Sequence, residues 1–186
     1  MDYLKKTASA SLLLATKINR TCIKFGFFYP YYKLTRDMMT EKVKKYDLLL
    51  RQAQSLAEGE TDDIALMANL SAIIHEAFHF WWTGFYRVIG EELVLGPFQG
   101  LLACTRIARG RGVCGTAWQE RRTLVVPDVH QFKGHIACSS ASQSEIVVPV
   151  FRNGEIIAVL DIDSEFLSTF DDVDKEWLER IVECFL

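Results

Sequence analysis

Three carboxylates at the outer ends of two apolar segments, and a cysteine that precedes them, lie in one stretch near the end of the sequence. The stretch spans residues 134–164, reads GHIACSSASQSEIVVPVFRNGEIIAVLDIDS, and contains Cys138, Glu145, Asp161 and Asp163. Apolar strands of this kind are usually buried on both faces, where an unpaired carboxylate is costly. A thiolate can attack an electrophilic atom, and a carboxylic acid with a raised pKa can donate the proton that a leaving oxygen needs. The residue types therefore predict acid-assisted thiol chemistry rather than packing alone.

Two more cysteines, Cys104 and Cys114, also lie in separate loops or strand ends. A redox enzyme without a cofactor needs a second thiol, because that thiol converts the sulfenic acid on the first into a reducible disulfide. The small polar neighbours of Cys138 favour a functional thiol there. Cys184 follows the apolar pattern of the last predicted helix, and we interpret Cys22 and Cys184 as small packed hydrophobic residues.

Neither a metal nor an organic cofactor is expected. The sequence has no CxxC pair and no His or Cys pair at zinc-finger spacing. The segment HEAFH at residues 75–79 fits the HExxH pattern of zinc proteases, but no third ligand or matching context follows it. No metal site is therefore predicted, and the thiols carry the redox chemistry.

The charge is distributed unevenly along the 186 residues. Residues 1–36 hold seven basic residues and one acid, and the remainder holds 14 basic and 23 acidic residues. An acidic body argues against nucleic-acid binding, and no apolar run approaches the roughly 20 residues that a membrane span needs. Five cysteines without a convincing secretory signal indicate a reducing setting, so we expect the cytoplasm.

The basic leader, residues 1–37, is expected to lie outside the folded domain. One interpretation is a transit peptide, which would place the protein in an organelle, and the other is a natural start at Met38 or Met39. We assign residues 38–186 to one catalytic domain and expect deletion of the leader to leave folding and activity nearly intact.

The spacing of apolar residues, caps and turns predicts a mixed α+β domain with one central antiparallel sheet flanked by helices. The Thr61-Asp-Asp segment, for example, opens the second helix with a capping residue and two acids. The predicted elements are helices over 41–59, 61–78, 115–122 and 170–186, a hairpin over 80–98, and strands over 123–129, 144–151 and 155–163.

The register of the last hairpin decides whether its acids converge, because side chains alternate between the faces of a strand. A two-residue loop at Asn153-Gly154 would send Asp161 to the face opposite Glu145. A three-residue loop that begins at Arg152 would set Glu145 directly across from Asp161, with Asp163 on the same face. We predict the three-residue loop, or another loop of odd length, since a shared face makes one carboxyl hold its proton and leaves the group ready to bind an ammonium.

The sequence also resembles a known family. The segments WWTGFYR, LGPFQGLLACTRIARGRGVCGTAW, VPDVHQFKGHIACSSASQSEIVVPV and AVLDIDS are similar, in order and spacing, to the free methionine-(R)-sulfoxide reductases, single-domain enzymes on the GAF fold. The resemblance covers residues 41–186. It implies a GAF-like domain in which Cys138 is the nucleophile, Cys104 the resolving cysteine and Cys114 an auxiliary cysteine.

The same resemblance implies the substrate site. Glu145, Asp161 and Asp163 match the acidic substrate-binding residues, and Trp82 and Tyr86 match aromatic residues that line the methionine pocket. The residue types fit, since carboxylates suit the ammonium of free methionine and aromatic rings suit its thioether chain.

The resemblance implies reduction of free L-methionine (R)-sulfoxide to methionine. The reaction would leave a Cys138–Cys104 disulfide, which a thioredoxin-like dithiol would reduce. The alternative is a GAF-type module that senses a small molecule or the redox state without catalysis. The sequence is also compatible with a homodimer.

Overall fold

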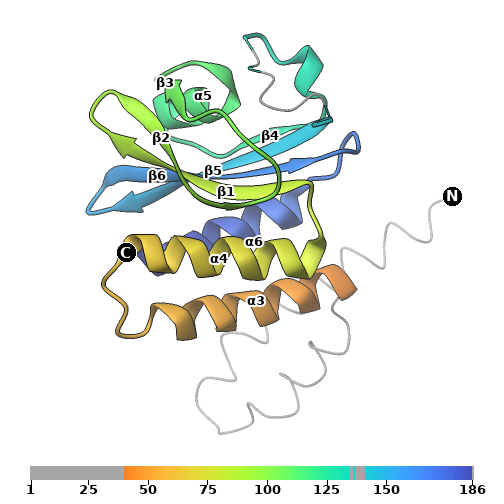
Figure 1. Ribbon diagram of the computed structural model, residues 1–186. Helices are drawn as coiled ribbons and strands as arrows, with labels where there is room; N and C mark the ends of the chain where they lie inside the picture. The colour runs from red at the N-terminus through yellow and green to blue at the C-terminus, as the bar shows by residue number, and fades with distance from the viewer. Residues whose placement is uncertain (1–39, 135, 137–140, 186) are drawn as a thin grey trace, which may run out of the picture. The chain divides into compact units, whose positions relative to one another are not determined.

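The structure, a computed structural model, describes residues 40–134, 136 and 141–185. The chain divides into two units between Lys44 and Lys45. The second unit contains one antiparallel sheet whose strands lie in the order β3-β2-β1-β6-β5-β4 (Figure 1). The strands are β1 (Trp82–Ile89), β2 (Glu92–Gln99), β3 (Arg106–Ala108), β4 (Leu124–Val126), β5 (Ser144–Arg152) and β6 (Glu155–Ser164).

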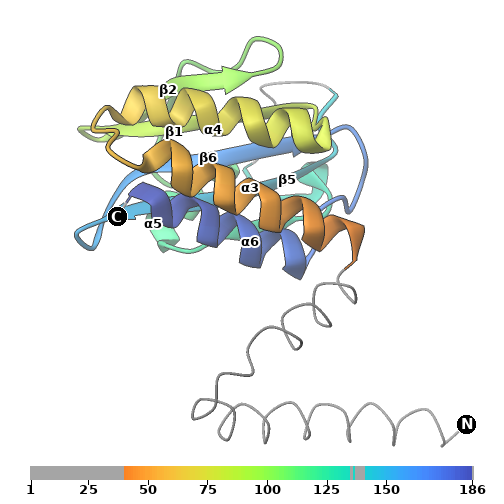
Figure 2. The same cartoon turned by 90° about the horizontal axis from the view of Figure 1, so that it is seen from below.

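Helices cover both faces of this sheet, which confirms the predicted α+β arrangement. Helices α4 (Asp63–Phe78) and α6 (Asp172–Val182) pack on one face, with α3 (Glu41–Ala57) beneath them, and α5 (Gly112–Glu120) lies on the other face (Figures 1 and 2). Two short 3₁₀ helices, η2 (Val129–Gln131) and η3 (Glu183–Phe185), complete the described elements. None of the helices in the described part of the chain has the length and apolar character that a membrane crossing would require.

The helix boundaries follow capping chemistry. The cap of α4 lies one residue later than the predicted Thr61, because Asp62 accepts from the backbone N–H groups of Ile64 (2.7 Å) and Ala65 (3.3 Å). Helix α6 begins with a capping box between Asp171 and Asp174, in which Asp171 is the cap.

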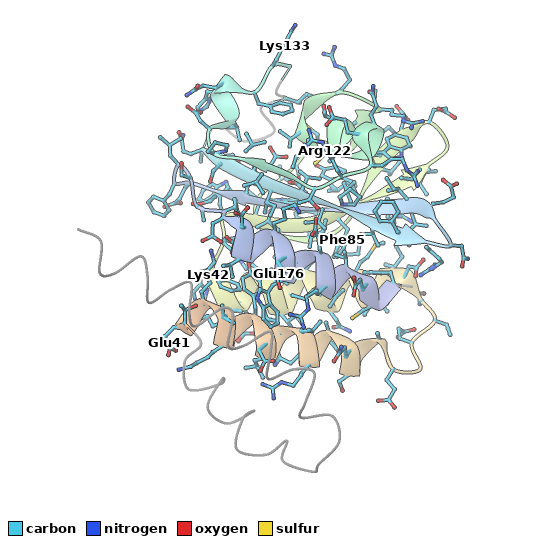
Figure 3. The ribbon with its side chains drawn as sticks, turned by 180° about the vertical axis from the view of Figure 1, so that it is seen from behind. Glu41, Lys42, Phe85, Arg122, Lys133 and Glu176 are labelled. Atoms are coloured by element: carbon cyan, nitrogen blue, oxygen red, sulfur yellow. The ribbon has the colours of Figure 1, made fainter. Side chains whose placement is uncertain are left out.

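The two faces of the sheet bury different sets of side chains, because successive strand residues point in opposite directions. The face toward α4 and α6, here called the helical face, buries Phe85, Ile146 and Leu160 completely. Figure 3 places Phe85 between the sheet and the helices, in edge contact with Phe185 (5.7 Å between ring centroids). The opposite face, here called the cavity face, packs against α5 and carries the candidate site.

The turn of the last hairpin differs from the prediction. Asn153 and Gly154 form a two-residue loop, with φ of 52° and 80°, so Arg152 pairs with Glu155. Asn-Gly suits this loop because both positions need positive φ. The predicted three-residue loop and the Glu145–Asp161 pairing are therefore wrong.

A bulge nevertheless brings the acids to one face. The pairing shifts from Phe151↔Ile156 to Val150↔Ala158, which leaves one extra residue, Ile157, on β6. One extra residue reverses the alternation of every side chain beyond it. Glu145 consequently pairs with Asp163, and Asp161 lies two residues along on the same face.

Candidate active site

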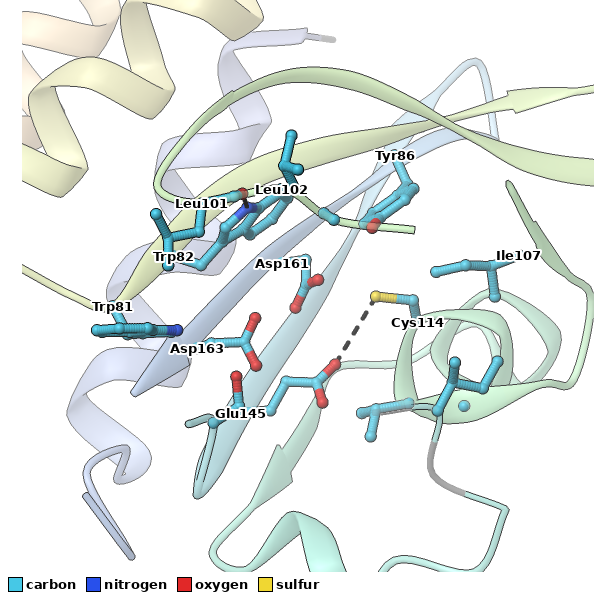
Figure 4. A pocket seen from close by; sticks show the side chains of 15 residues that line it. Trp81, Trp82, Tyr86, Leu101, Leu102, Ile107, Cys114, Glu145, Asp161 and Asp163 are labelled. Carbon is cyan, nitrogen blue, oxygen red and sulfur yellow. Dashed lines mark hydrogen bonds between the residues drawn. The ribbon is translucent and has the colours of Figure 1, made fainter. Parts of the chain in front are cut away.

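A cavity of about 40 Å³ lies on the cavity face, between the sheet and α5. Its lining joins acids, aromatic rings and one thiol that come from distant parts of the sequence (Figure 4). The main contributors are Trp82 and Tyr86 of β1, Cys114 of α5, Glu145 of β5, and Asp161 and Asp163 of β6. All three predicted acids and both predicted aromatic residues thus lie around one cavity.

The three central strands place these groups in two rows across the sheet. In the first row, Trp82 pairs with Asp163, and Asp163 pairs with Glu145. In the second row, Asp161 pairs with Gly84. A Cβ atom at Gly84 would overlap the Phe98 side chain and lie 2.6 Å from Trp82 Cη2, so only glycine fits beside the aromatic rings.

The aromatic rings form one wall of the site. The rings of Trp82 and Tyr86 stack at 5.9 Å between centroids, and Trp82 also stacks on Phe98 at 5.4 Å. The indole Nε1–H of Trp82 donates to the carbonyl of Leu101 at 3.1 Å. Trp82 therefore combines an apolar surface toward the cavity with a tether on the loop that leads to Cys104.

The thiol of Cys114 belongs to the apolar core around α5 and also contacts the acids. Its S–H donates to Glu145 Oε1 at 3.7 Å, and Figure 4 shows this contact with Asp161 beside it. Burial raises the pKa of the Cys114 thiol, and the charges of Asp161 and Glu145 raise it further. Cys114 is consequently a protonated thiol at neutral pH, which makes it a poor nucleophile.

Burial also raises the pKa values of the three acids. Desolvation raises the pKa of Glu145, followed by the charges of Asp161 and Asp163, and desolvation together with the Asp163 charge raises the pKa of Asp161. Burial raises the pKa of Asp163 to about 6, against a hydrogen bond from Ser142 that lowers it. The pKa of Tyr86 is raised by burial and then by Asp161. The site therefore favours neutral acids or a cationic partner.

The cluster has unused capacity to bind a donor or a cation. Asp161 is 6% exposed, and its Oδ1 atom has no hydrogen-bond partner among the described residues. No Lys, Arg or His belongs to the described residues that line the cavity. An oxygen that is buried without a partner is costly, so a ligand that supplies a positive charge or a donor would be stabilised here.

The cysteines divide into three groups. Cys104 is disulfide-bonded, whereas Cys114 and Cys184 are free thiols, buried and half-buried respectively. Cys138 and Cys22 lie outside the described residues, so the nucleophile assignment and the Cys138–Cys104 pairing stay predictions.

Some lining residues did not emerge from the sequence. Trp81, Leu101, Leu102, Ile136 and Ser142 all contribute to the cavity. Each lies within a few residues of a predicted site residue, and this proximity was the available signal. The HEAFH segment is absent from the site, because α4 ends at Phe78 and His79 adopts a left-handed conformation (φ 54°) as its cap.

Comparisons with known proteins identify the class of domain first. Residues 65–183 match the GAF domain family. GAF domain-containing protein A of Dictyostelium discoideum is 55% identical over 143 residues, which cover 76% of this chain and 90% of the relative. The chain is therefore a GAF domain protein, in agreement with the antiparallel sheet flanked by helices.

Two further comparisons narrow the class. The free methionine-R-sulfoxide reductase of Escherichia coli is 47% identical over 142 residues, which cover 76% of this chain and 86% of that protein. The X-ray structure of free methionine-R-sulfoxide reductase from Neisseria meningitidis in complex with its substrate matches with a TM-score of 0.76 and 50% identity, covering 79% of this chain and 89% of that one. The chain belongs to the free methionine-R-sulfoxide reductase family, as the sequence motifs predicted.

Proposed function

We propose that this protein reduces free L-methionine (R)-sulfoxide to L-methionine by cysteine chemistry. The observation that carries the proposal is the group of three acids beside the Trp82 and Tyr86 rings, in which Glu145 and Asp161 are buried and Asp163 is half-buried. The family membership supports the same substrate, since the relatives at 47% and 50% identity are named for it.

The site chemistry suits a free amino acid. A free methionine sulfoxide carries an ammonium group, and carboxylates in a cavity without a described cation attract it. A peptide-bound residue has no such charge and would leave the acids unpaired, so the same groups select against it. The stacked rings of Trp82 and Tyr86 suit the thioether chain and its methyl group.

The proposed reaction moves one oxygen and closes one disulfide. The Cys138 thiolate attacks the sulfoxide sulfur, and the oxygen takes a proton from an acid of the cluster. The oxygen then moves to the Cys138 sulfur as its bond to the substrate sulfur and the new bond between the two sulfur atoms break, so that methionine leaves and Cys138 is a sulfenic acid. The Cys104 thiol then attacks the Cys138 sulfur, and the oxygen departs as water while a disulfide forms. A thioredoxin-like dithiol reduces that disulfide by exchange. Cys104 is disulfide-bonded in the structure, which supports its part in this exchange.

Cys114 has a supporting role in this scheme. Its raised pKa makes it unsuited to attack sulfur, and its S–H donates to Glu145. We propose that Cys114 orients the Glu145 carboxyl, while a protonated acid of the cluster donates to the leaving oxygen.

The test measures methionine formation from the R and S epimers of methionine sulfoxide, each free and peptide-bound, with thioredoxin as reductant. We expect turnover with the free R epimer alone. Cys138→Ser should abolish even one turnover, and the half-buried Cys184→Ser is the matched control that should keep full activity. Binding of the sulfoxide without methionine formation would instead support the sensor alternative.

We further propose that residues 38–186 suffice for this activity and that the reaction takes place in a reducing compartment. A protein lacking residues 1–37 should keep most of its turnover. Insolubility or a large loss of turnover would show that the leader contributes to the domain.

A further inference from the structure

Three potential metal ligands converge in the cavity from three different elements. The Sγ atom of Cys114 in α5 and carboxylate oxygens of Glu145 in β5 and Asp161 in β6 all lie within 4.8 Å of one another. All three residues are buried, and Figure 4 shows their side chains pointing toward a common space. No other group of three such ligands occurs in the described parts of the chain.

The spacing of these atoms suits a tetrahedral metal ion. A Zn²⁺ ion with bonds of about 2.3 Å to sulfur and about 2.0 Å to oxygen holds those two atoms about 3.5 Å apart in a tetrahedron. Cys114 Sγ and Glu145 Oε1 lie 3.7 Å apart. Replacement of the thiol proton by the ion would therefore need only a small adjustment of the two side chains.

A second observation is that one oxygen of the cluster has no hydrogen-bond donor among the described residues. The Oδ1 atom of Asp161 is buried without a hydrogen bond among the described residues, and the residue is only 6% exposed. The described lining supplies no positive side chain to neutralise the acids. A divalent cation would satisfy this oxygen and remove the like-charge repulsion in one step.

We propose that Cys114, Glu145 and Asp161 form a binding site for a thiophilic divalent cation, Zn²⁺ or Cd²⁺, which excludes the substrate. A thiolate with two carboxylates favours these ions over Mg²⁺ and Ca²⁺, which prefer six or more oxygen ligands. The Cys114 S–H bond breaks, the sulfur bonds to the metal, and the proton passes to solvent. A water molecule or the half-buried Asp163 supplies the fourth ligand.

The consequence for catalysis rests on the proposed function, in which the same acids hold the substrate. An ion on Glu145 and Asp161 occupies the groups that would bind the ammonium. Zn²⁺ should therefore raise the KM for methionine sulfoxide without lowering kcat, and bound substrate should in turn weaken the metal site.

The experiment measures metal binding directly, in the full chain with Cys104 in its disulfide. Cd²⁺ is titrated while the ultraviolet absorption of the cadmium–thiolate bond is recorded, and Zn²⁺ affinity is measured by calorimetry. One ion per chain should bind with a thiolate band. Cys114→Ser should remove the band and weaken binding by about a hundredfold, and Asp161→Asn should weaken it by about tenfold or more with the band retained.

The matched control is Cys184→Ser, which also removes one free thiol and should bind like the parent. An excess of Mg²⁺ should not displace the ion. Unchanged binding and band in Cys114→Ser would place the ion on another cysteine and overturn the proposal, as would the absence of any saturable binding. If Cys114→Ser does not fold, Asp161→Asn and Glu145→Gln, which keep side-chain volume, decide the question by their affinities.

The two proposals can fail separately. Metal binding at the cluster in a protein that forms no methionine would leave the metal site standing and refute the proposed function. Methionine formation that Zn²⁺ does not inhibit, together with no thiolate band, would support the proposed function and refute the metal site.

Discussion

Two buried aspartates on opposite sides of the sheet have contrasting environments. Asp174 of α6, on the helical side, is 1% exposed, and Asp161 of β6, on the cavity face, is 6% exposed. Asp174 accepts from the hydroxyl of Tyr46 at 2.7 Å with Oδ1 and from the backbone N–H of Asp171 at 2.8 Å with Oδ2. Asp161 has an oxygen without a partner among the described residues and two further acids nearby.

The difference distinguishes a structural acid from a binding acid. Both oxygens of Asp174 are satisfied by the fold itself, so its burial is compensated internally. Asp161 has hydrogen bonds with Cys114 and Glu145, but its Oδ1 atom has no partner within the described chain, which is typical of groups that await a ligand. The comparison predicts that loss of Asp174 reduces stability and that loss of Asp161 reduces function.

The largest expected effect is on activity, from Asp161→Asn or Glu145→Gln. Each change keeps the side-chain volume and removes a carboxyl group. That group would hold the substrate ammonium when ionised or donate a proton when neutral. We expect kcat/KM for free methionine sulfoxide to fall by about a hundredfold, the order found for loss of a single stabilising group in an active site. Steady-state kinetics measures the loss.

The same two variants should not lose stability. Removal of one acid relieves the repulsion that burial enforces among Glu145, Asp161 and Asp163, so the free energy of unfolding in urea should stay equal or rise. A variant that unfolded as readily as an Asp174 variant would show that the cavity acids are structural, and the contrast between the two faces would be lost.

The next effect is on stability, from Asp174→Ala. This change leaves the buried Tyr46 hydroxyl without its acceptor and removes half of the capping box at the start of α6. The free energy of unfolding should fall by about 2–4 kcal/mol, the sum of a buried hydrogen bond to a charged group and a helix cap. Urea denaturation followed by circular dichroism measures the change.

A milder variant divides that loss into its parts. Tyr46→Phe removes the hydroxyl donor and keeps the capping box, so it should cost about 1.5–3 kcal/mol, the range for a hydrogen bond to a charged group. Both variants should retain turnover once folded. Loss of turnover in a folded Asp174→Ala protein would mean that the helical face also contributes to the site.

Much of the fold could be predicted because local signals agreed with one another. Apolar spacing predicted the helices and strands, and the acids among apolar residues indicated the site. The cap of α4 was misplaced by one residue, because Thr61 and Asp62 are both good caps and only the bonds to Ile64 and Ala65 distinguish them.

The hairpin register could not be predicted, for a physical reason. Asn153-Gly154 indicates the two-residue loop that the structure contains, but the bulge at Ile157 leaves no trace in the uninterrupted apolar run over residues 156–160. The prediction that the three acids lie on one face is therefore correct, although the loop length from which it was argued is wrong. Ser142 and Ile136 were missed because lining residues in loops carry no periodicity.

A smaller effect on stability is expected from Trp82→Phe. This variant tests whether a polar group on the cavity face can have a structural role instead of binding a ligand. The indole N–H of Trp82 is satisfied within the chain by Leu101, as Asp174 is satisfied on the helical face. Its loss should cost about 1 kcal/mol of unfolding free energy and speed protease cleavage in the loop over residues 100–104. Trp118→Phe, which removes another indole of the same core, should leave that cleavage rate unchanged.

The smallest effect concerns an acid that is neither buried nor unpaired. The carboxylate of Asp63, at the start of α4, accepts two hydrogen bonds from the Arg152 guanidinium (2.9 and 2.6 Å) at the closed end of the hairpin. These bonds hold the pKa of Asp63 below its ordinary value. Both side chains are more than a third exposed, so solvent screening limits the pair to less than about 1 kcal/mol.

The pH dependence of Arg152→Gln tests this assignment. An acid whose pKa is lowered by folding stabilises the protein above its unfolded pKa of about 3.9, and the contribution is lost as the pH falls through the folded value. The stability difference between parent and variant should therefore be constant from neutral pH to about 5 and shrink below about 4. It should not vanish, because Arg152 Nε–H also donates to the Phe185 carbonyl (3.0 Å), which does not titrate. Asp63→Asn is the matched control: a difference of equal size at pH 3 and pH 7 in both variants would show that the ion pair contributes nothing and that the arginine acts through Phe185 alone.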